Sequence, residues 1–573
     1  MKRRDAMAQL RVELYRPLLA VGAFSLVMNL LSLTVPIYMS QVYDRVLTSY
    51  SIETLIMLTA IALALLALLA ALDEVRQRLL TQSTLKAEHT LGPALLAASV
   101  KDQLAGRPDA TQALRDLAAL RTFAASPLVP SFFDAPLVPF YVLIIFLMHW
   151  ILGLAALCGA LGMLGFTILN QAVTARRADK ANRAANALLN AADHQTRNAD
   201  VIEAMGFMPD IARHWQAKHE AVLAEQYAVH SRGIRYQTLS RFVRLAAQVI
   251  TLALGAGLVL DLELTPGMMF AASIILARGL QPVEAAVGSW RTLLAAKGQF
   301  QRVRDALVRH GAAREPMPLP EPKGQIDSEN VTFLVGQERR PILRGVSFAV
   351  AAGETLGIIG PAASGKSTLA RLILGVWHPS AGRIRLDGAD VSQWDRAAIG
   401  RHVGYLPQEV ELFPATVAQN IARMGDIDAE AVAAAAQMAG VHEMILRLPR
   451  GYDTPIMVGG LMISPGQRQR IGLARAFYGA PRLVVLDEPN ANLDGEGEEA
   501  LGRALRLAKE RGVTVVVITH RLGVLRHADK VLSLRDGAVQ AFGPRDEVLA
   551  RATKRPALAQ AGAVVPVRTI APQ

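Results

Sequence analysis

Cysteine is almost missing from this sequence, since Cys158 is the only one among 573 residues. A single cysteine excludes a framework of intramolecular disulfides. Because Cys158 lies within an apolar stretch, we expect a buried residue without chemistry of its own. Charge is scarce as well, at 19% of residues against 52% hydrophobic residues and a mean hydropathy of +0.27. This hydrophobic fraction and this mean hydropathy are high for a soluble protein and indicate membrane spans.

Charged residues are absent from long stretches of the first half. Residues 17–40 and 54–72 contain none, and each stretch is long enough to cross a hydrocarbon core of about 30 Å as a helix. Residues 135–175 lack Asp, Glu, Lys and Arg over 41 positions, which is about twice the length that one crossing needs. We therefore expect a hairpin of two spans there, with its turn near His149 and Trp150.

Two shorter apolar stretches follow, and the acidic turn Asp261-Leu262-Glu263 separates them. The first half of the chain, residues 1–310, is therefore predicted to be a membrane domain with six spanning helices. Their approximate ranges are 17–40, 54–72, 132–149, 151–173, 242–260 and 264–280. A cleaved signal peptide is disfavoured, because the first span has no evident small-residue cleavage site and further spans follow.

The net charge of +12 and the pI near 9.9 fit either nucleic-acid binding or basic loops beside a membrane. Lysine and arginine gather in residues 1–16, 73–131 and 174–241, whereas the alternate loops hold almost none apart from Arg45. The positive-inside rule then places both termini and both long loops in the cytoplasm. Because this arrangement accounts for most of the basic charge, we expect no nucleic-acid partner.

A proline-rich segment divides the two halves of the chain. Residues 316–324 read PMPLPEPKG, and each proline disfavours helix at its own position and at the preceding one. We expect a linker over residues 311–323. Short β-branched runs then alternate with helical patterns, which predicts a mostly parallel α/β sheet over residues 324–560, followed by a tail at 561–573.

The α/β half contains a glycine-rich phosphate-binding motif. Gly360, Gly365, Lys366 and Ser367 fit G-x-x-x-x-G-K-[ST], between an apolar strand and a helix. In such a loop the backbone amides cradle phosphates, the lysine reaches the terminal phosphates, and the serine hydroxyl is available to Mg²⁺. A structural loop that matches by chance is the alternative, and the flanking strand and helix argue against it.

Two further apolar strands end in residues suited to phosphate chemistry. In RLVVLDEPN the apolar strand ends at Asp487 and Glu488. The first acid can hold the coordination shell of Mg²⁺, and the second can orient or deprotonate an attacking water. Alone, this pair is a common helix-capping or surface feature, but here it follows a phosphate loop. VTVVVITHRLG ends near His520, and a histidine at a strand end is more often structural or solvated than functional.

The set GPAASGKST, YLPQEVELF, ISPGQRQRIGLARA, LVVLDEPNANLD and ITHR resembles the nucleotide-binding domain of ABC transporters over about residues 324–550. The resemblance implies ATP and Mg²⁺ as cofactors, with Glu488 as catalytic base, His520 as γ-phosphate contact and Lys366 as a further catalytic residue. Implied metal contacts are Ser367, Gln408 and Asp487. Implied ATP contacts are Gly360, Ala363, Ser364, Gly365, Lys366, Ser367, Thr368, Gln408, Asp487, Ser464, Gly466 and Gln467.

The resemblance also implies an architecture and an assembly. An ABC exporter membrane domain of six helices would be fused to a cytoplasmic α/β P-loop ATPase domain. Since one chain carries half of what the family needs, a homodimer is expected, and Ser464, Gly466 and Gln467 would close over ATP bound to the other subunit. The segment ISPGQRQR has a capping-box pattern with Ser464 at N-cap, Pro465 at N1 and Gln467 at N3, so the proline costs at most one anion-binding amide.

The membrane half resembles type I secretion permease/ATPases that export RTX-type proteases and lipases. The segments that carry the likeness are VPIYMSQVYDRVL, SFFDAPLVPFYVLIIFLMHWILG and TPGMMFAASIILARGLQPVEAAVGSW. The likeness implies ATP-driven export of an unfolded polypeptide with a C-terminal signal. Its partners would be a periplasmic adaptor and an outer-membrane channel, and its place the bacterial inner membrane. The N-terminal cysteine-peptidase domain of bacteriocin exporters is not expected.

Several positions depart from the family pattern. Val335 stands where many relatives place an aromatic residue that stacks on adenine, and MVGGLM lacks the glutamate common before the signature. Ala491 replaces a frequent serine. Arg278 and Glu284 lie close to the apolar sequence of span six, so they are candidates for residues that line the transport pathway. Alternatively, Arg278 is a side chain that snorkels to the cytoplasmic surface of the membrane.

Three other functions remain open at the level of sequence. An exporter of lipids or drugs would share the ATPase but need no periplasmic adaptor. An ABC ATPase used for regulation or nucleic-acid work is disfavoured by the six predicted spans. A catalytically silent paralogue is disfavoured because Lys366, Glu488 and His520 are all present.

Overall fold

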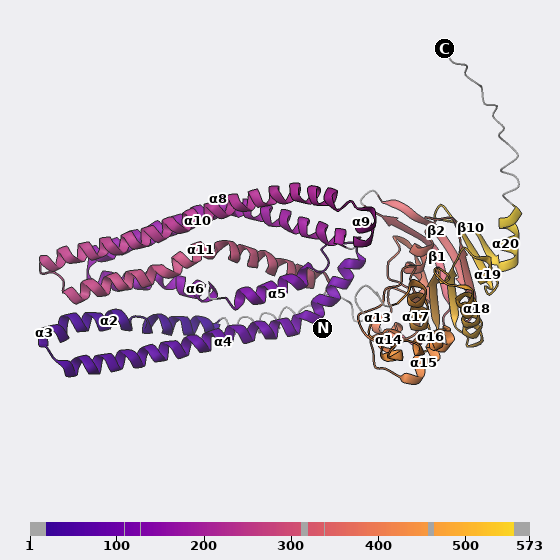
Figure 1. Ribbon diagram of the computed structural model, residues 1–573, viewed down its shortest axis with the longest axis horizontal. Coiled ribbons are helices and arrows are strands. Elements are labelled where there is room, and N and C mark those ends of the chain that lie inside the picture. Colours follow the sequence, from indigo (N-terminus) through magenta and orange to yellow (C-terminus); the bar gives the residue numbers. More distant parts are fainter. Residues whose placement is uncertain are drawn as a thin grey trace, which may run out of the picture. The chain divides into compact units, whose positions relative to one another are not determined.

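The computed structural model describes residues 19–107, 109–126, 128–196, 198–310, 319–336, 339–456 and 463–554. The chain divides into two compact units, Met1–Ala312 and Ala313–Gln573 (Figure 1). The MVGGLM segment, the predicted tail and most of the predicted linker lie outside the described residues. Every predicted site residue lies within the described residues.

The first unit is built from long helices. The first helix among its described residues covers residues 19–31. The helices that follow are α2 (Thr34–Gln41), π-helix η1 (Val42–Val46), α3 (Leu47–Ser49), α4 (Ile52–Leu104), α5 (Gln112–Ala124), α6 (Leu128–Asp134), 3₁₀-helix η2 (Ala135–Leu137), α7 (Val138–Met148), α8 (Trp150–Thr196), α9 (Ala199–Met205), α10 (Met208–Leu260) and α11 (Pro266–His310).

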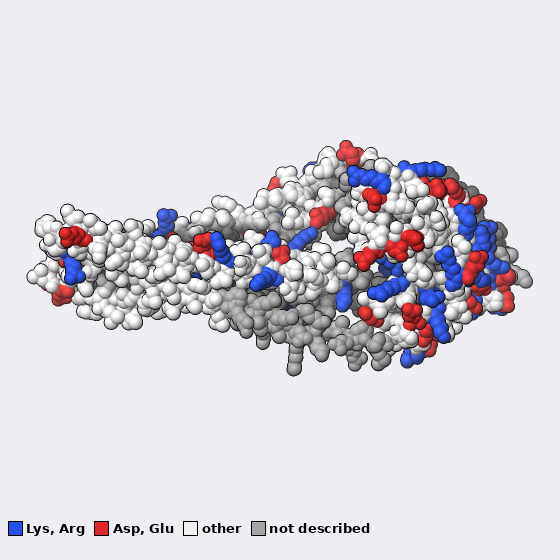
Figure 2. Space-filling view, turned by 90° about the horizontal axis from the view of Figure 1, so that it is seen from below, with Lys and Arg blue, Asp and Glu red and all other residues white. Residues whose placement is uncertain are grey.

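Among the described residues, four helical stretches are long and apolar enough to cross a membrane: Leu19–Ser49, Ile52–Leu104, Leu128–Met148 and Met208–Leu260. The apolar part of α8, Trp150–Phe166, is shorter. Because one crossing needs only about 20 residues, α4 and α10, with 53 residues each, extend far beyond it. In the view of Figure 2 a broad part of this unit shows few charged side chains. The arrangement of six spans stays a prediction.

The two turns predicted between apolar stretches occur where the sequence placed them. α7 ends at Met148 and α8 begins at Trp150, with His149 extended at φ −162° and ψ 136°. α10 ends at Leu260 and α11 begins at Pro266.

Asp44, in the π-helix η1, caps the start of α11. Its carboxylate accepts hydrogen bonds from the Gly267 backbone N–H and the Thr265 hydroxyl, both at 2.8 Å. A carboxylate is stabilised at the positive N-terminal end of a helix. This contact therefore fixes η1, which lies between α2 and α4, against the start of α11.

The expectation that Cys158 is buried was wrong, because Cys158 is exposed on α8. An apolar side chain on a helix that faces lipid needs no protein neighbour, since lipid tails are as apolar as a protein core. Hydrophobic character within a membrane span therefore does not predict burial in protein.

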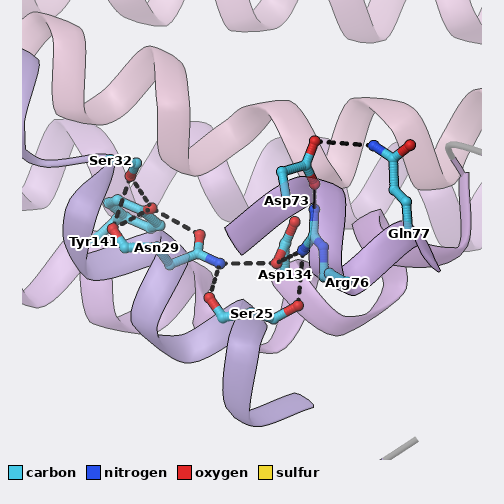
Figure 3. Close-up of polar contacts among 8 residues, drawn as sticks. All are labelled: Ser25, Asn29, Ser32, Asp73, Arg76, Gln77, Asp134 and Tyr141. Atoms are coloured by element: carbon cyan, nitrogen blue, oxygen red, sulfur yellow. Dashed lines mark hydrogen bonds and ion pairs between the residues drawn. The ribbon is translucent and has the colours of Figure 1, made fainter. Parts of the chain in front are cut away.

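A polar network joins the helix of residues 19–31, α4, α6 and α7 (Figure 3). Arg76, only 6% exposed, donates to the Ser25 hydroxyl (2.9 Å) and Asp73 (2.8 Å) and lies 3.5 Å from Asp134. Asn29 donates to the same Asp134 oxygen at 2.8 Å. Tyr141 of α7 donates to Asn29 Oδ1 at 2.8 Å. A buried charge is costly unless it is paired, so these bonds fix the positions of the four helices relative to one another.

The second unit contains two sheets. The smaller has the order β2-β1-β4-β5 and is antiparallel. The larger has the order β10-β9-β3-β8-β7-β6, and only its edge pair β10–β9 is antiparallel. The strands are β1 (Ile326–Val335), β2 (Arg340–Val350), β3 (Thr355–Ile359), β4 (Ala381–Leu386), β5 (Ala389–Asp390), β6 (Val403–Leu406), β7 (Leu483–Asp487), β8 (Thr514–Ile518), β9 (Lys530–Arg535) and β10 (Ala538–Pro544).

Helices accompany these sheets, as the alternating sequence pattern predicts. They are α12 (Lys366–Ile373), α13 (Arg396–Ile399), α14 (Val417–Ile421), α15 (Ala429–Met438), α16 (His442–Leu446), 3₁₀-helix η3 (Gly451–Asp453), α17 (Pro465–Phe477), α18 (Gly495–Glu510), α19 (Leu522–Leu525) and α20 (Arg545–Lys554). Strands β7 and β8 are buried along their whole length, as their β-branched runs predict.

The order of three parallel strands positions the site. β8 lies between β3 and β7, so the carboxyl ends of all three meet at one edge of the sheet. The phosphate loop follows β3, Glu488 follows β7 and His520 follows β8.

Candidate functional site

The phosphate loop runs from β3 into α12 and needs glycine at two positions. Gly360 has φ +155° and Gly365 has φ +94°. A Cβ on Gly365 would lie 2.6 Å from Leu343 Cδ2, and one on Gly360 would lie 2.8 Å from Ser364 Oγ. Ala363, at φ 62°, is a non-glycine residue in the same left-handed region. Such a succession of backbone conformations forms an anion-binding nest at the start of a helix.

Lys366 is buried, at 7% exposure, and its ammonium group is held by the loop itself. Nζ donates to the Gly360 and Pro361 carbonyls at 2.9 and 2.8 Å. Burial lowers the pKa of Lys366, while Glu488 and Asp487 act in the opposite direction. A phosphate in the nest would offer this cation a charged acceptor in place of neutral carbonyls.

Two orphaned polar atoms fit a bound phosphate and its cation. Ser364 Oγ in the loop and Asp487 Oδ1 at the end of β7 are both buried without a hydrogen-bond partner. Buried polar atoms are nearly always satisfied, so each orphan points to a missing ligand. Thr368 lies in the first turn of α12, four residues after Ser364.

Asp487 and Ser367 contact each other at the predicted metal position. Burial raises the pKa of the Asp487 carboxyl, and a hydrogen bond from Ser367 opposes that rise. Hydroxyl and carboxylate oxygens are ligands that Mg²⁺ accepts, and a bound cation would lower the pKa again. Gln408, the third predicted metal contact, instead donates to Glu488.

Glu488 lies at the centre of the site. Its carboxylate accepts from Gln408 Nε2 at 3.2 Å and lies 3.4 Å from His520 Nε2. Its backbone has φ 50°, and its N–H donates to the Ile518 carbonyl at 3.0 Å. A non-glycine residue in this region costs about 1–3 kcal/mol and persists where the surroundings hold it in place. The structure thus brings together three residues that lie far apart in the sequence.

Gln469 and the pair Asn490–Thr519 also belong to this cluster, although the sequence did not point to them. Gln469, on α17 and 2% exposed, donates to the Glu488 carbonyl at 3.3 Å. The buried Thr519 hydroxyl and the Asn490 amide oxygen are 2.9 Å apart and link the loops after β7 and β8. These are contacts between segments distant in sequence, so no local pattern could have revealed them.

The capping box predicted at the start of α17 is confirmed. The Gln467 N–H donates to Ser464 Oγ (3.2 Å), and the Ser464 N–H donates to Gln467 Oε1 (3.0 Å), with Pro465 in the first turn. Ser464 and Pro465 are exposed. A Cβ on Gly466 would lie 2.6 Å from the Asn492 carbonyl oxygen, so this position needs glycine. The result is an exposed helix end with its remaining amides available to an anion.

The aromatic residue nearest to Val335 in the sequence is already engaged. Phe333 stacks on Trp377 with 5.3 Å between ring centroids, and the Arg371 guanidinium lies 4.7 Å from the same Trp377 ring. Val335 itself is 43% exposed. Leu343, which packs against Gly365 of the phosphate loop, pairs with Phe333, two residues before Val335.

The chain is similar to known proteins over nearly its whole length. Residues 18–281 match the ABC transporter transmembrane region and residues 343–491 match the ABC transporter family. The type I secretion system ATP-binding protein PrsD of Rhizobium meliloti (strain 1021) is 44% identical over 93% of this chain and 92% of that protein. The cyclolysin secretion/processing ATP-binding protein CyaB of Bordetella pertussis is 32% identical over 92% of this chain and 75% of that protein.

A solved structure, that of a bacterial Atm1-family ABC exporter with ATP bound, has the same fold. It is 21% identical in sequence, with a TM-score of 0.81, over 96% of this chain and 99% of that one. An α-helical membrane domain is thus fused to an α/β nucleotide-binding domain. The family match and the likeness to PrsD show that the activity is ATP hydrolysis coupled to transport. Together with the extent of its likeness to PrsD, these findings show that the chain is a membrane protein of the ABC transporter family.

Proposed function

We propose that Glu488 is the catalytic base of ATP hydrolysis. The observation that carries the proposal is the position of its carboxylate between Gln408 and His520, at 3.2 and 3.4 Å. Gln408 orients the attacking water together with Glu488, and His520 contacts the γ-phosphate. Lys366 holds the terminal phosphates once it leaves the Gly360 and Pro361 carbonyls.

Ser367, Asp487 and Gln408 would hold Mg²⁺. When bound, the cation neutralises phosphate charge that develops during transfer. The residues of the loop bind and orient the nucleotide through the nest of backbone amides between Gly360 and Thr368, which include those of Ala363, Ser364 and Gly365.

A homodimer with two composite ATP sites completes the proposal. Ser464, Gly466 and Gln467 form an exposed helix end, which suits an anion presented by a second copy of the chain. Closure of two copies would place this end over the γ-phosphate held by the partner's phosphate loop.

The cargo is proposed to be an unfolded polypeptide with a C-terminal signal. The support is the likeness to relatives named for type I secretion and for cyclolysin secretion. This ATP-driven export would place the chain in the bacterial inner membrane, with a periplasmic adaptor and an outer-membrane channel as partners. No nucleic-acid partner is proposed.

The ATPase rate of the purified full-length protein tests the cargo. A C-terminal fragment of the protein encoded beside this transporter should change the rate, whereas an N-terminal fragment of the same protein should not. Export of lipids or drugs is the second candidate, and it would gain support from a response to those compounds together with indifference to every such fragment.

Val335→Tyr is expected to tighten ATP binding about tenfold, because a ring at this exposed strand end would stack on adenine, and base stacking contributes about 1–3 kcal/mol. Val335→Leu is the matched control, since it adds bulk without a ring and should leave the affinity unchanged. Equilibrium titration with ATP measures both. Equal affinities of the tyrosine variant and the wild type would place adenine elsewhere.

A further inference from the structure

A polar pocket lies between α10 and α11, where the predicted spans 242–260 and 264–280 meet the predicted cytoplasmic parts of these helices. Its volume is about 830 Å³. Arg244 is 17 residues before Asp261 and Arg278 is 12 residues after Pro266, so both lie roughly 18–25 Å along the helices from the turn that joins them. This is within the thickness of a hydrocarbon core of about 30 Å. The polar side chains that line the pocket include Arg241, Arg244, Gln248, Arg278, Gln281 and Glu284.

Positive charge in this pocket exceeds negative charge. Arg244 Nε and Glu284 Oε2 form an ion pair at 2.5 Å and neutralise each other. Arg241 and Arg278 make no ion pair with a carboxylate among the described residues. Uncompensated cations inside or beside a membrane span are costly and usually face a wet path or an anionic ligand.

A second pocket continues the first one along α11. Its volume is about 1130 Å³, and Thr292 lines both. In it Arg302 pairs with Asp116 at 2.6 Å, whereas Lys297 has no ion-pair partner among the described residues. The basic character therefore extends beyond the membrane-level pocket. We call the two pockets together the basic track.

The dimensions of the basic track suit an extended chain. From Ile274 to Arg302 it follows 28 residues of α11, roughly 40 Å at the helical rise per residue. An extended polypeptide covers that length with about a dozen residues. A folded domain of about 100 residues has a radius of gyration of about 13 Å and is far too large for these pockets.

We propose that the basic track binds acidic segments of the exported polypeptide while they are extended. This inference rests on the proposed export of a polypeptide. The unpaired Arg241, Arg278 and Lys297 attract aspartate and glutamate side chains, and the glutamines supply hydrogen bonds to the chain. An anionic lipid headgroup fits less well, because Arg302 lies roughly 54 Å along α11 from Pro266, well beyond the bilayer core.

Peptide binding to the full-length transporter in discs of neutral phosphatidylcholine tests the proposal. Two labelled, unstructured peptides of about a dozen residues are compared, one rich in aspartate and the other with asparagine at the same positions. The wild type should bind the aspartate peptide about tenfold more tightly, and the preference should shrink as salt screens the charges. The double variant Arg241→Gln/Arg278→Gln should lose the preference.

Two control variants separate charge from misfolding. Arg241→Lys/Arg278→Lys keeps both charges and should keep the preference. Arg78→Gln removes an exposed arginine of the same helical unit that does not line the track, and it should also keep the preference. An equal loss in Arg78→Gln would show diffuse attraction and overturn the proposal, as would a preference that survives in the double glutamine variant.

The remaining outcomes separate a failure of the basic-track proposal from a failure of the proposed polypeptide export. If the C-terminal cargo fragment alters the ATPase rate but the wild type binds both peptides equally, export stands and the track is wrong. A peptide preference that depends on Arg241 and Arg278, without any response to cargo fragments, supports the track and contradicts the proposed export. Anionic lipid that copurifies with the wild type but not with the double glutamine variant, together with no peptide preference, would make this a lipid site and overturn the proposal.

Discussion

Glu488→Gln should lower steady-state ATP hydrolysis by about a hundredfold to ten-thousandfold while ATP binding persists. Glutamine keeps the size of the side chain and its hydrogen bonding but cannot take a proton from water. The backbone contacts of residue 488 with Ile518 and Gln469 do not involve the carboxylate, so the fold of the loop should survive. Phosphate release under saturating ATP measures the loss, and titration with ATP measures the retained binding.

Glu499→Gln is the matched control for this substitution. Glu499 lies on α18, its side chain is 76% exposed, and its nearest cation, Arg503, is 3.8 Å away. The control should hydrolyse ATP at the wild-type rate. A Glu488→Gln protein that retained half of the wild-type rate would remove Glu488 from its proposed role.

Ser464→Arg should reduce ATP turnover by about a hundredfold or more, equivalent to about 2.7 kcal/mol. The substitution removes the hydroxyl that caps α17 and places a bulky side chain on the exposed helix end proposed to meet the partner's γ-phosphate. Loss of the cap alone costs about 1 kcal/mol, so most of the effect must come from blocked closure of the dimer. ATPase rates of the purified variants measure it.

Two neighbouring variants separate these contributions. Ser464→Ala removes only the cap and should lower turnover by no more than about fivefold. Pro465→Gly should change turnover only modestly, because it restores one N–H at a position where proline is favoured and adds chain flexibility. A wild-type rate in Ser464→Arg would exclude this helix end from the ATP site, and a hundredfold gain in Pro465→Gly would identify the proline as a brake.

Local features of this protein were predictable from the sequence because each depends on residues close together in the chain. The capping box needs only Ser464, Pro465 and Gln467 within one helical turn. The break at His149 follows from an uncharged run about twice as long as one membrane crossing needs. The phosphate loop is likewise a contiguous motif, with glycines where its backbone takes positive φ.

Contacts between distant segments were decided by the tertiary structure alone. The strand order β3-β8-β7 sets Glu488 beside His520, and packing of α17 brings Gln469 to the Glu488 carbonyl. In the helical unit, Asp44 caps α11 across more than two hundred residues of sequence. No periodicity encodes such partners, because they depend on how whole strands and helices pack. The exposure of Cys158 has the same origin, since an apolar sequence fits lipid and protein neighbours equally well.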